Sequence, residues 1–159
     1  MGFAKKLARR SVLTTGVGTS AAGLTVAAVQ TSTGWNLEPG ALLLADRGLC
    51  CIDEFSRMRA HDKTVVHEAL EQQTVSVAKA GIVCRLPCRT AVLAACNAKG
   101  NYDIDAPLTV NTTLSAPLLS RFDLIFILRD SKNRDWDSEV ADHILKFGAG
   151  TGIFRNHYF

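Results

Sequence analysis

An uninterrupted apolar run at residues 49–52 ends directly in two carboxylates, Asp53 and Glu54. Continuous rather than alternating apolar residues are typical of a strand that is buried on both faces of a parallel sheet. At the carboxyl end of such a strand, the first carboxylate could orient a magnesium ion that bridges nucleotide phosphates. The second could accept a proton from an attacking water. The alternative is an acidic pair that only solvates the end of a core strand, because the motif is short.

Three further apolar runs have the same continuous character, at residues 41–45, 91–96 and 124–128. We predict that each is a buried strand. Between these runs, residues 59–73 carry apolar side chains at helical spacing, with charged residues between them. Strands that alternate with helices indicate an α/β fold with a mostly parallel sheet and flanking helices.

Two segments have the pattern of inserted hairpins. Residues 74–86 alternate polar and apolar side chains around a short turn, which predicts a β-hairpin with Lys79 at its tip. Residues 25–38 form a second insertion-like segment with a glycine in its middle. Later in the chain, residues 135–146 have a helical pattern, whereas residues 147–159 are glycine-rich and then aromatic, without periodicity.

Two more polar side chains stand beside apolar runs. Asn97 follows the run at 91–96, where an amide can hold a lytic water or a phosphate oxygen, although asparagine is also common at the start of a turn. Arg121 precedes the run at 124–128, where a guanidinium could reach the γ-phosphate bound by a neighbouring subunit. The alternative for Arg121 is a surface arginine paired with Asp123.

The composition excludes some classes of protein. The 159 residues are 47% hydrophobic and 21% charged, which is typical of a globular domain rather than a disordered chain. A net charge of +3 permits nucleic-acid binding without indicating it, since a dedicated binder usually has a clustered basic face. No apolar run approaches the roughly 18 residues of a membrane span, so we expect an intracellular protein without membrane contact.

Five cysteines do not have the spacing of a disulfide framework, at positions 50, 51, 84, 88 and 96. Several lie in apolar runs, so we interpret them as packing residues of a protein from a reducing compartment. A zinc site built from Cys84, Cys88, His61 and His67 is the weaker alternative, because zinc-binding pairs usually have the tighter C-x-x-C spacing.

Longer segments resemble one family. GALLLADRGLCCIDEF, EALEQQTVSVAKAGIVCRLPCRTAVLAACNAKG and APLLSRFD are similar to the minichromosome maintenance (MCM) replicative helicases. SVLTTGVGTSAAGLTV, GLCCIDEF and DSKNRDWD are most similar to the family's ninth-homologue branch, which partners the eighth homologue in recombinational repair. The resemblance implies an AAA+ P-loop ATPase core that binds ATP and Mg²⁺. It also implies a hexameric ring around DNA in the nucleus, acting in DNA replication or repair.

The resemblance assigns roles to the polar residues. Asp53 and Glu54 correspond to the Walker B pair, with Asp53 on the metal and Glu54 as the base. Asn97 corresponds to sensor 1, which contacts nucleotide and lytic water, and Arg121 to the arginine finger that acts in trans. The hairpin at 74–86 resembles the presensor-1 hairpin, whose lysine, here Lys79, would contact single-stranded DNA. Residues 23–40 resemble the helix-2 insert of the same family.

The chain also departs from the family's pattern. It contains no G-x-x-x-x-G-K-S/T phosphate loop, and residues 147–159 do not resemble the lid helices. We therefore expect residues 1–146 to be a partial AAA+ domain without the Walker A segment and lid, followed by an unrelated tail. We expect this fragment not to hydrolyse ATP alone. Two alternatives remain: a non-catalytic module for ring interaction, and an AAA+ ATPase of the magnesium chelatase type.

Overall fold

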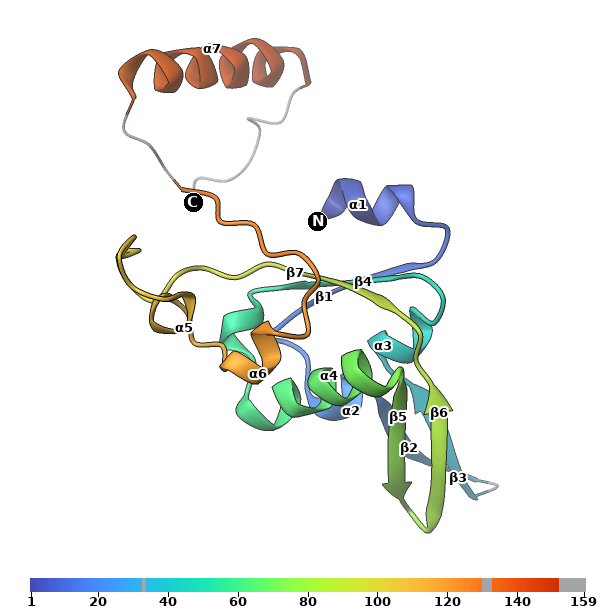
Figure 1. Cartoon of the computed structure of the whole chain (residues 1–159). Helices are drawn as coiled ribbons and strands as arrows, with labels where there is room; N and C mark the ends of the chain where they lie inside the picture. Colours follow the sequence, from blue (N-terminus) through green and yellow to red (C-terminus); the bar gives the residue numbers. More distant parts are fainter. Residues whose placement is uncertain (33, 130–132, 152–159) are drawn as a thin grey trace. The chain divides into compact units, whose positions relative to one another are not determined.

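The structure is a computed structural model, and it describes residues 1–32, 34–129 and 133–151. The chain divides into two compact units, Met1–Asp123 and Leu124–Phe159, which are described separately (Figure 1). The elements in chain order are α1 (Gly2–Leu7), β1 (Ser11–Thr15), α2 (Ala21–Leu24), β2 (Val26–Thr31), β3 (Gly34–Pro39), α3 (Ala41–Leu44), β4 (Leu49–Asp53), the 3-10 helix η1 (Phe55–Arg57), α4 (Ala60–Gln72), β5 (Thr74–Lys79), β6 (Ile82–Pro87), β7 (Ala91–Ala94), α5 (Leu108–Asn111), α6 (Ala116–Leu119) and α7 (Arg134–Thr151).

A parallel sheet of strand order β1-β4-β7 is the centre of the first unit. In β4, the middle strand, Cys50, Cys51 and Ile52 are completely buried, as expected for a strand that is covered on both faces. The predicted strands at 49–52 and 91–96 are thus confirmed as β4 and β7. Sequence analysis missed β1, whose three hydroxyl residues interrupt the apolar pattern. The α/β fold with a mostly parallel sheet is confirmed.

Two of the four predicted strands are wrong. Residues 41–45 form the single helical turn α3, with Ala41 and Leu42 buried and Leu44 half exposed. A short apolar run does not distinguish a buried strand from a buried helical turn. Residues 124–128 form no strand, and their side chains are exposed, up to 96% for Leu128. A strand requires a partner for its backbone groups, and none of the described strands pairs with this segment.

Helix α4 and two hairpins complete the first unit. Helix α4 confirms the prediction for residues 59–73, and it buries Val66 and Ala69 in the core. Strands β5 and β6 confirm the hairpin, with Ala80 and Gly81 both at positive φ in the two-residue turn. Strands β2 and β3 form a second hairpin within the predicted insertion. Figure 1 shows both hairpins extending from the same side of the sheet and α4.

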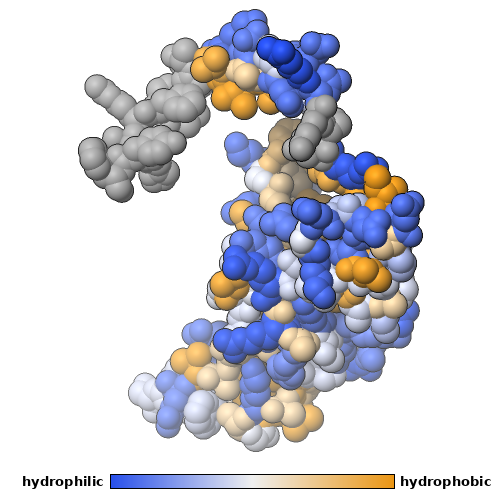
Figure 2. All heavy atoms as spheres, turned by 90° about the vertical axis from the view of Figure 1, so that its left-hand side faces the viewer, coloured by the Kyte–Doolittle hydropathy of each residue, from blue (hydrophilic) through white to orange (hydrophobic). Residues whose placement is uncertain are grey.

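The second unit contains α7, which begins one residue before the predicted helix and continues past Lys146 to Thr151. In Figure 2 the spheres of this helix are mostly blue, with orange ones gathered along one side. Residues 152–159 of the expected tail lie outside the described residues. Among the described residues, no helix is both long and apolar enough to cross a bilayer.

Candidate active site

The carboxyl end of β4 lies between the ends of β1 and β7. The backbone carbonyl of Asp53 accepts a hydrogen bond from the Gly16 amide at 2.7 Å, just beyond β1. On the other side, the Ala95 amide donates to the Ile52 carbonyl at 3.0 Å, and the Phe55 amide donates to the Ala95 carbonyl at 2.8 Å. The chain that leaves β4 is therefore fixed to the end of each neighbouring strand. This is the edge of a parallel sheet at which α/β proteins bind ligands.

The backbone turns sharply at Glu54, which adopts the left-handed conformation with φ of 49°. One carboxylate oxygen of Asp53, Oδ1, accepts the Glu54 amide at 2.8 Å, which stabilises this turn. A Cβ on Gly16 would lie 2.4 Å from the Glu54 carbonyl oxygen, so only glycine fits beside the turn. The Glu54 side chain accepts a hydrogen bond from Arg57 at 3.2 Å, in an exposed ion pair.

Asn97 follows β7 by three residues and lies exposed in the loop after it. Because the Ala95 backbone bonds to both sides of the Asp53-Glu54 step, the structure brings the start of this loop to the end of β4. The Asp53 carboxylate is exposed as well. Carboxylate and amide oxygens are donors that suit Mg²⁺, so this donor set fits the metal side of a magnesium–nucleotide site.

The loop after Asn97 is organised by a residue that sequence analysis missed. Asn111, at the end of α5, is 3% exposed. Its side-chain oxygen accepts the Asp103 amide at 2.7 Å, and its side-chain nitrogen donates to the carbonyls of Asp103 at 2.8 Å and Ala106 at 3.2 Å. Its backbone carbonyl accepts the Lys99 amide at 2.8 Å. An asparagine in a four-residue helix gives no sequence signal for this role.

Arg121 follows α6 and contacts α4, whose residues precede it by about fifty positions. Its Nη2 donates to Glu71 Oε1 at 2.6 Å, and its Nε lies 3.4 Å from His67 Nε2. The sequence alternative paired Arg121 with Asp123, whereas the structure pairs Arg121 with Glu71. The ring of Phe122 meets the buried ring of Phe55 edge to face. Sequence analysis did not identify Glu71 and His67 as partners of Arg121, because it placed α4 correctly but could not orient it.

Lys79 is the last residue of β5, beside the Ala80-Gly81 turn rather than within it. It is half-buried, and its Nζ donates a hydrogen bond to the backbone carbonyl of Val26 at 2.6 Å. Val26 is the first residue of β2, so this bond joins the two hairpins. The ammonium group that was predicted to contact DNA is therefore occupied by a backbone carbonyl in this structure.

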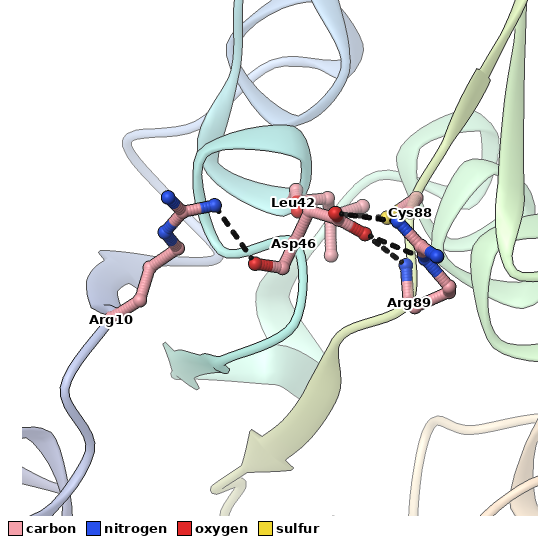
Figure 3. A network of polar contacts seen from close by, with 5 residues as sticks. All are labelled: Arg10, Leu42, Asp46, Cys88 and Arg89. Atoms are coloured by element: carbon pink, nitrogen blue, oxygen red, sulfur yellow. Dashed lines mark hydrogen bonds and ion pairs between the residues drawn. The ribbon is translucent and has the colours of Figure 1, made fainter.

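A network of polar contacts stabilises the opposite edge of the sheet (Figure 3). The Asp46 carboxylate accepts hydrogen bonds from the Arg89 backbone amide at 2.8 Å and from Nη2 of the same residue at 3.1 Å, while Arg10 donates to the Asp46 carbonyl at 3.1 Å. The hydrogen bonds from Arg89 hold the pKa of Asp46 below its usual range. Beside them, Cys88 Sγ donates to the Leu42 carbonyl at 3.5 Å. Arg10, Asp46 and Arg89 precede β1, β4 and β7, so these contacts connect the amino ends of the three strands. Asp53 lies at the opposite end of the middle strand, β4.

Three of the five cysteines, Cys50, Cys51 and Cys88, are buried, whereas Cys84 is partly buried and Cys96 is exposed. Burial raises the pKa of Cys50 to about 12 and that of Cys88 to about 11, and burial also raises the pKa of Cys96. These thiols therefore stay protonated near neutral pH and are poor nucleophiles and metal ligands. Within the described part of the chain, no group of three or more histidine, cysteine or acidic residues could hold a metal ion.

Comparison with known proteins extends these observations. The chain is 61% identical over 143 residues to a protein of Oryza sativa subsp. indica named "Probable DNA helicase MCM9", and 59% identical over 143 residues to its namesake in Arabidopsis thaliana. It is 51% identical over 151 residues to the "Minichromosome maintenance protein MCM" of Saccharolobus solfataricus. These alignments cover 90%, 90% and 93% of this chain, but only 21%, 22% and 22% of the relatives. The chain thus spans about a fifth of their length.

A family model supports the same conclusion. The model of the MCM P-loop domain matches residues 1–147, which include both hairpins and each of the predicted site residues. The magnesium chelatase alternative is therefore not supported. The likeness to the ninth-homologue branch, inferred from three short segments, agrees with the identity to the two plant proteins. With a partial α/β core, an Asp-Glu pair at the end of its middle strand and this match, the chain belongs to the MCM family.

Proposed function

We propose that these residues form part of the ATPase core of an MCM-type DNA helicase, which acts in the nucleus in DNA replication or recombinational repair. The observation that carries the proposal is the position of Asp53 and Glu54. They lie at the carboxyl end of the middle strand of the parallel sheet. The residues on either side of the pair, Ile52 and Phe55, are hydrogen-bonded to Ala95, at the start of the loop that contains Asn97. The names of the relatives, which include "DNA replication licensing factor mcm6" and "Probable DNA helicase MCM9", support the choice of reaction.

Each polar residue has a distinct task in this proposal. Asp53 would hold Mg²⁺, because one of its oxygens stays available when the other accepts the Glu54 amide. When bound, Mg²⁺ neutralises charge on the phosphates of ATP. Glu54 would accept a proton from the attacking water, and Asn97 would orient that water and the nucleotide. Arg57 must release the Glu54 carboxylate for this task, and an exposed ion pair is weak enough to permit it.

Two residues outside this site, Arg121 and Lys79, would contact the adjacent subunit and DNA. Arg121 would act in trans on nucleotide held by the adjacent MCM-type subunit of a hexamer, with the eighth homologue as the proposed neighbour. Lys79 would contact single-stranded DNA through its phosphates, without reading the sequence. In this structure, DNA would have to compete with the Val26 carbonyl for the Lys79 ammonium group.

The 159 residues do not contain a phosphate loop, so the phosphate side of the site is not provided within them. We therefore propose that residues 1–146, a partial AAA+ core, do not hydrolyse ATP on their own. The second candidate function, a non-catalytic module that completes a partner's site, is favoured by one observation. Arg121 is exposed, and the carboxylate that it contacts belongs to α4 of this chain.

A graft tests the proposal. Residues 1–147 would replace the matching segment of the S. solfataricus relative, and ATP turnover and DNA unwinding would be measured with single-stranded and forked DNA. The expected result is activity in the graft and a loss of at least about a hundredfold in ATP turnover after Glu54→Gln. A folded hexameric graft with no turnover would contradict the enzymatic proposal. ATP turnover by the 159-residue chain alone that Glu54→Gln abolishes would contradict the proposed inactivity of the fragment.

A further inference from the structure

The guanidinium group of Arg121 is held along one edge. In arginine, the Nε–H and one Nη2–H point in the same direction and form one bidentate edge, and Nη1 with the second hydrogen of Nη2 forms another. In this structure the first edge faces α4, where Glu71 accepts from Nη2 at 2.6 Å and His67 Nε2 lies 3.4 Å from Nε. Within the described residues, Nη1 makes no hydrogen bond, so the second edge is available.

The two residues that contact this edge, His67 and Glu71, lie on one helix, α4, which packs against the core. His67 and Glu71 are four residues apart in α4, so they lie on the same face of the helix. The same helix buries Val66 and Ala69 in the core, which fixes its rotation about its own axis. The two side chains also contact each other, with His67 Nε2 3.8 Å from Glu71 Oε2.

The backbone of Arg121 is fixed as well. Its amide donates to the Leu118 carbonyl at 3.2 Å, at the end of α6, and Leu118 is buried. The next residue, Phe122, packs against the buried ring of Phe55. The long arginine side chain is therefore restrained at its root by the core and at its head by α4.

We propose that Glu71 and His67 are positioning residues for Arg121. They occupy one edge of the guanidinium so that the other edge is presented, already oriented, to a phosphate group of nucleotide bound by the adjacent subunit. The inference rests on the proposed function of Arg121 as a finger in trans. The physical basis is preorganisation: a restrained guanidinium loses less rotational freedom when it meets the transition state, and small displacements of a catalytic group have large effects on rate.

An inhibitory role for Glu71 predicts the opposite effect of removing its charge on the activity of the partner's site. If the carboxylate only neutralised Arg121 and kept it from the phosphate, removal of its charge would raise activity. If Glu71 positions Arg121, the same change lowers the turnover number of the partner's site and leaves the KM for ATP nearly unchanged. The direction of the change in kcat therefore separates the two roles.

The first experiment is complementation. The 159-residue chain is mixed with the full-length S. solfataricus relative, in which the residue that aligns with Arg121 has been changed to alanine and ATP turnover has been lost. Restored ATP turnover then reports the arginine supplied by this chain. We expect restoration by the unmodified chain, none by Arg121→Ala, and about a tenfold lower kcat with Glu71→Gln. His67→Phe should lower kcat in the same direction. The matched control is Glu68→Gln, which removes a charge from the same helix. The Glu68 carboxylate accepts a hydrogen bond from the Ser76 amide and is not one of the described partners of Arg121, so kcat should stay unchanged.

The outcomes distinguish the two proposals. No restoration by the unmodified chain, or equal restoration by Arg121→Ala, would contradict the finger in trans. Restoration that depends on Arg121 but is unchanged or raised by Glu71→Gln would overturn the positioning role alone.

The second experiment needs no partner and no nucleotide. In a ¹⁵N NMR spectrum of the chain, the Arg121 Nε–Hε signal should be sharp and slow to exchange with water, because it is held against His67 and Glu71. Glu71→Gln should speed that exchange at least severalfold, whereas Glu68→Gln should not. The inference would be overturned if the signal of the unmodified chain exchanged like that of a solvated arginine, or if Glu71→Gln left its exchange unchanged. This test does not depend on the result of the complementation experiment.

Discussion

Phe55 and Phe122 meet edge to face, with ring centroids 6.0 Å apart and ring planes at 82°. Each ring follows a residue of the proposed chemistry, since Phe55 comes after Glu54 and Phe122 after Arg121. The contact therefore links two places that are far apart in sequence: the turn that carries the proposed base and the segment that carries the proposed finger. Aromatic pairs of this geometry stabilise beyond the area that they bury.

Phe122→Leu should lower the free energy of unfolding by about 1–2 kcal/mol, because it removes the edge-to-face contact and leaves space beside Phe55. Urea unfolding followed by circular dichroism measures the change. Phe3→Leu is the matched control, since Phe3 is 75% exposed. Equal effects of the two substitutions would show that the ring pair contributes nothing specific.

Gly16→Ala should destabilise the fold by about 1–3 kcal/mol, because the added Cβ would lie 2.4 Å from the Glu54 carbonyl oxygen and would displace the turn after β4. The measurement is again urea unfolding. Gly2→Ala, where a Cβ meets nothing within 4 Å, serves as the control and should be neutral or slightly stabilising. A neutral Gly16→Ala would mean that the turn at Glu54 moves at little cost.

The contact between Asp46 and Arg89 predicts a pH dependence of stability. Because the pKa of Asp46 is lowered in the folded chain, its contribution is fully present above the unfolded-state value of about 3.9. The contribution is lost as the pH falls from there through the folded-state pKa. The difference in unfolding midpoint between the unmodified chain and Asp46→Asn should therefore be constant above about pH 5 and shrink towards pH 3.

Asp105→Asn, at an exposed aspartate outside this network, is the control for that series. Its difference from the unmodified chain should lack the decline that Asp46→Asn shows. A difference for Asp46→Asn that is constant down to pH 3 would contradict the assignment.

Lys79→Ala should loosen the contact between the two hairpins, because it removes the bond to the Val26 carbonyl. We expect faster hydrogen exchange of the β2–β3 amides, with Val83→Ala, an exposed position of β6, as the control. If Lys79 also contacts a phosphate in the assembled protein, the dependence of single-stranded DNA affinity on salt should weaken by about one phosphate contact. Unchanged exchange would show that the bond does not couple the hairpins.

Asn111→Asp should destabilise the loop after Asn97. The substitution replaces a buried donor with an acceptor that faces the carbonyls of Asp103 and Ala106, which is expected to cost about 1–3 kcal/mol. Asn101→Asp, at an exposed position of the same loop, is the control. Hydrogen exchange of the Asp103 amide gives a local measurement, and equal exchange in the two variants would argue against the role assigned to Asn111.

Local sequence pattern predicted β4, β7, α4 and the β5–β6 hairpin correctly. The pattern of α4 is long enough to show a period of 3.6, and that of the hairpin shows a period of two and includes a turn with its own residue preference. For β4 and β7 the pattern was only a short continuous apolar run, which also fits a buried helical turn. It failed for α3, where four apolar residues fit either conformation. It failed for residues 124–128 because a strand depends on a partner, and no local pattern provides one. It missed β1, which is a strand because it pairs with β4 and not because of its own composition.

The sequence by itself determined that Asp53 and Glu54 end a buried strand, since both the strand and its end are local features. Only the tertiary structure decided what Arg121 and Lys79 contact. Arg121 contacts Glu71 across 50 residues of sequence, and Lys79 contacts Val26 across 53. Long cationic side chains are compatible with many partners. Which one they meet depends on how α4 and the two hairpins pack on the core, and no single segment contains that information.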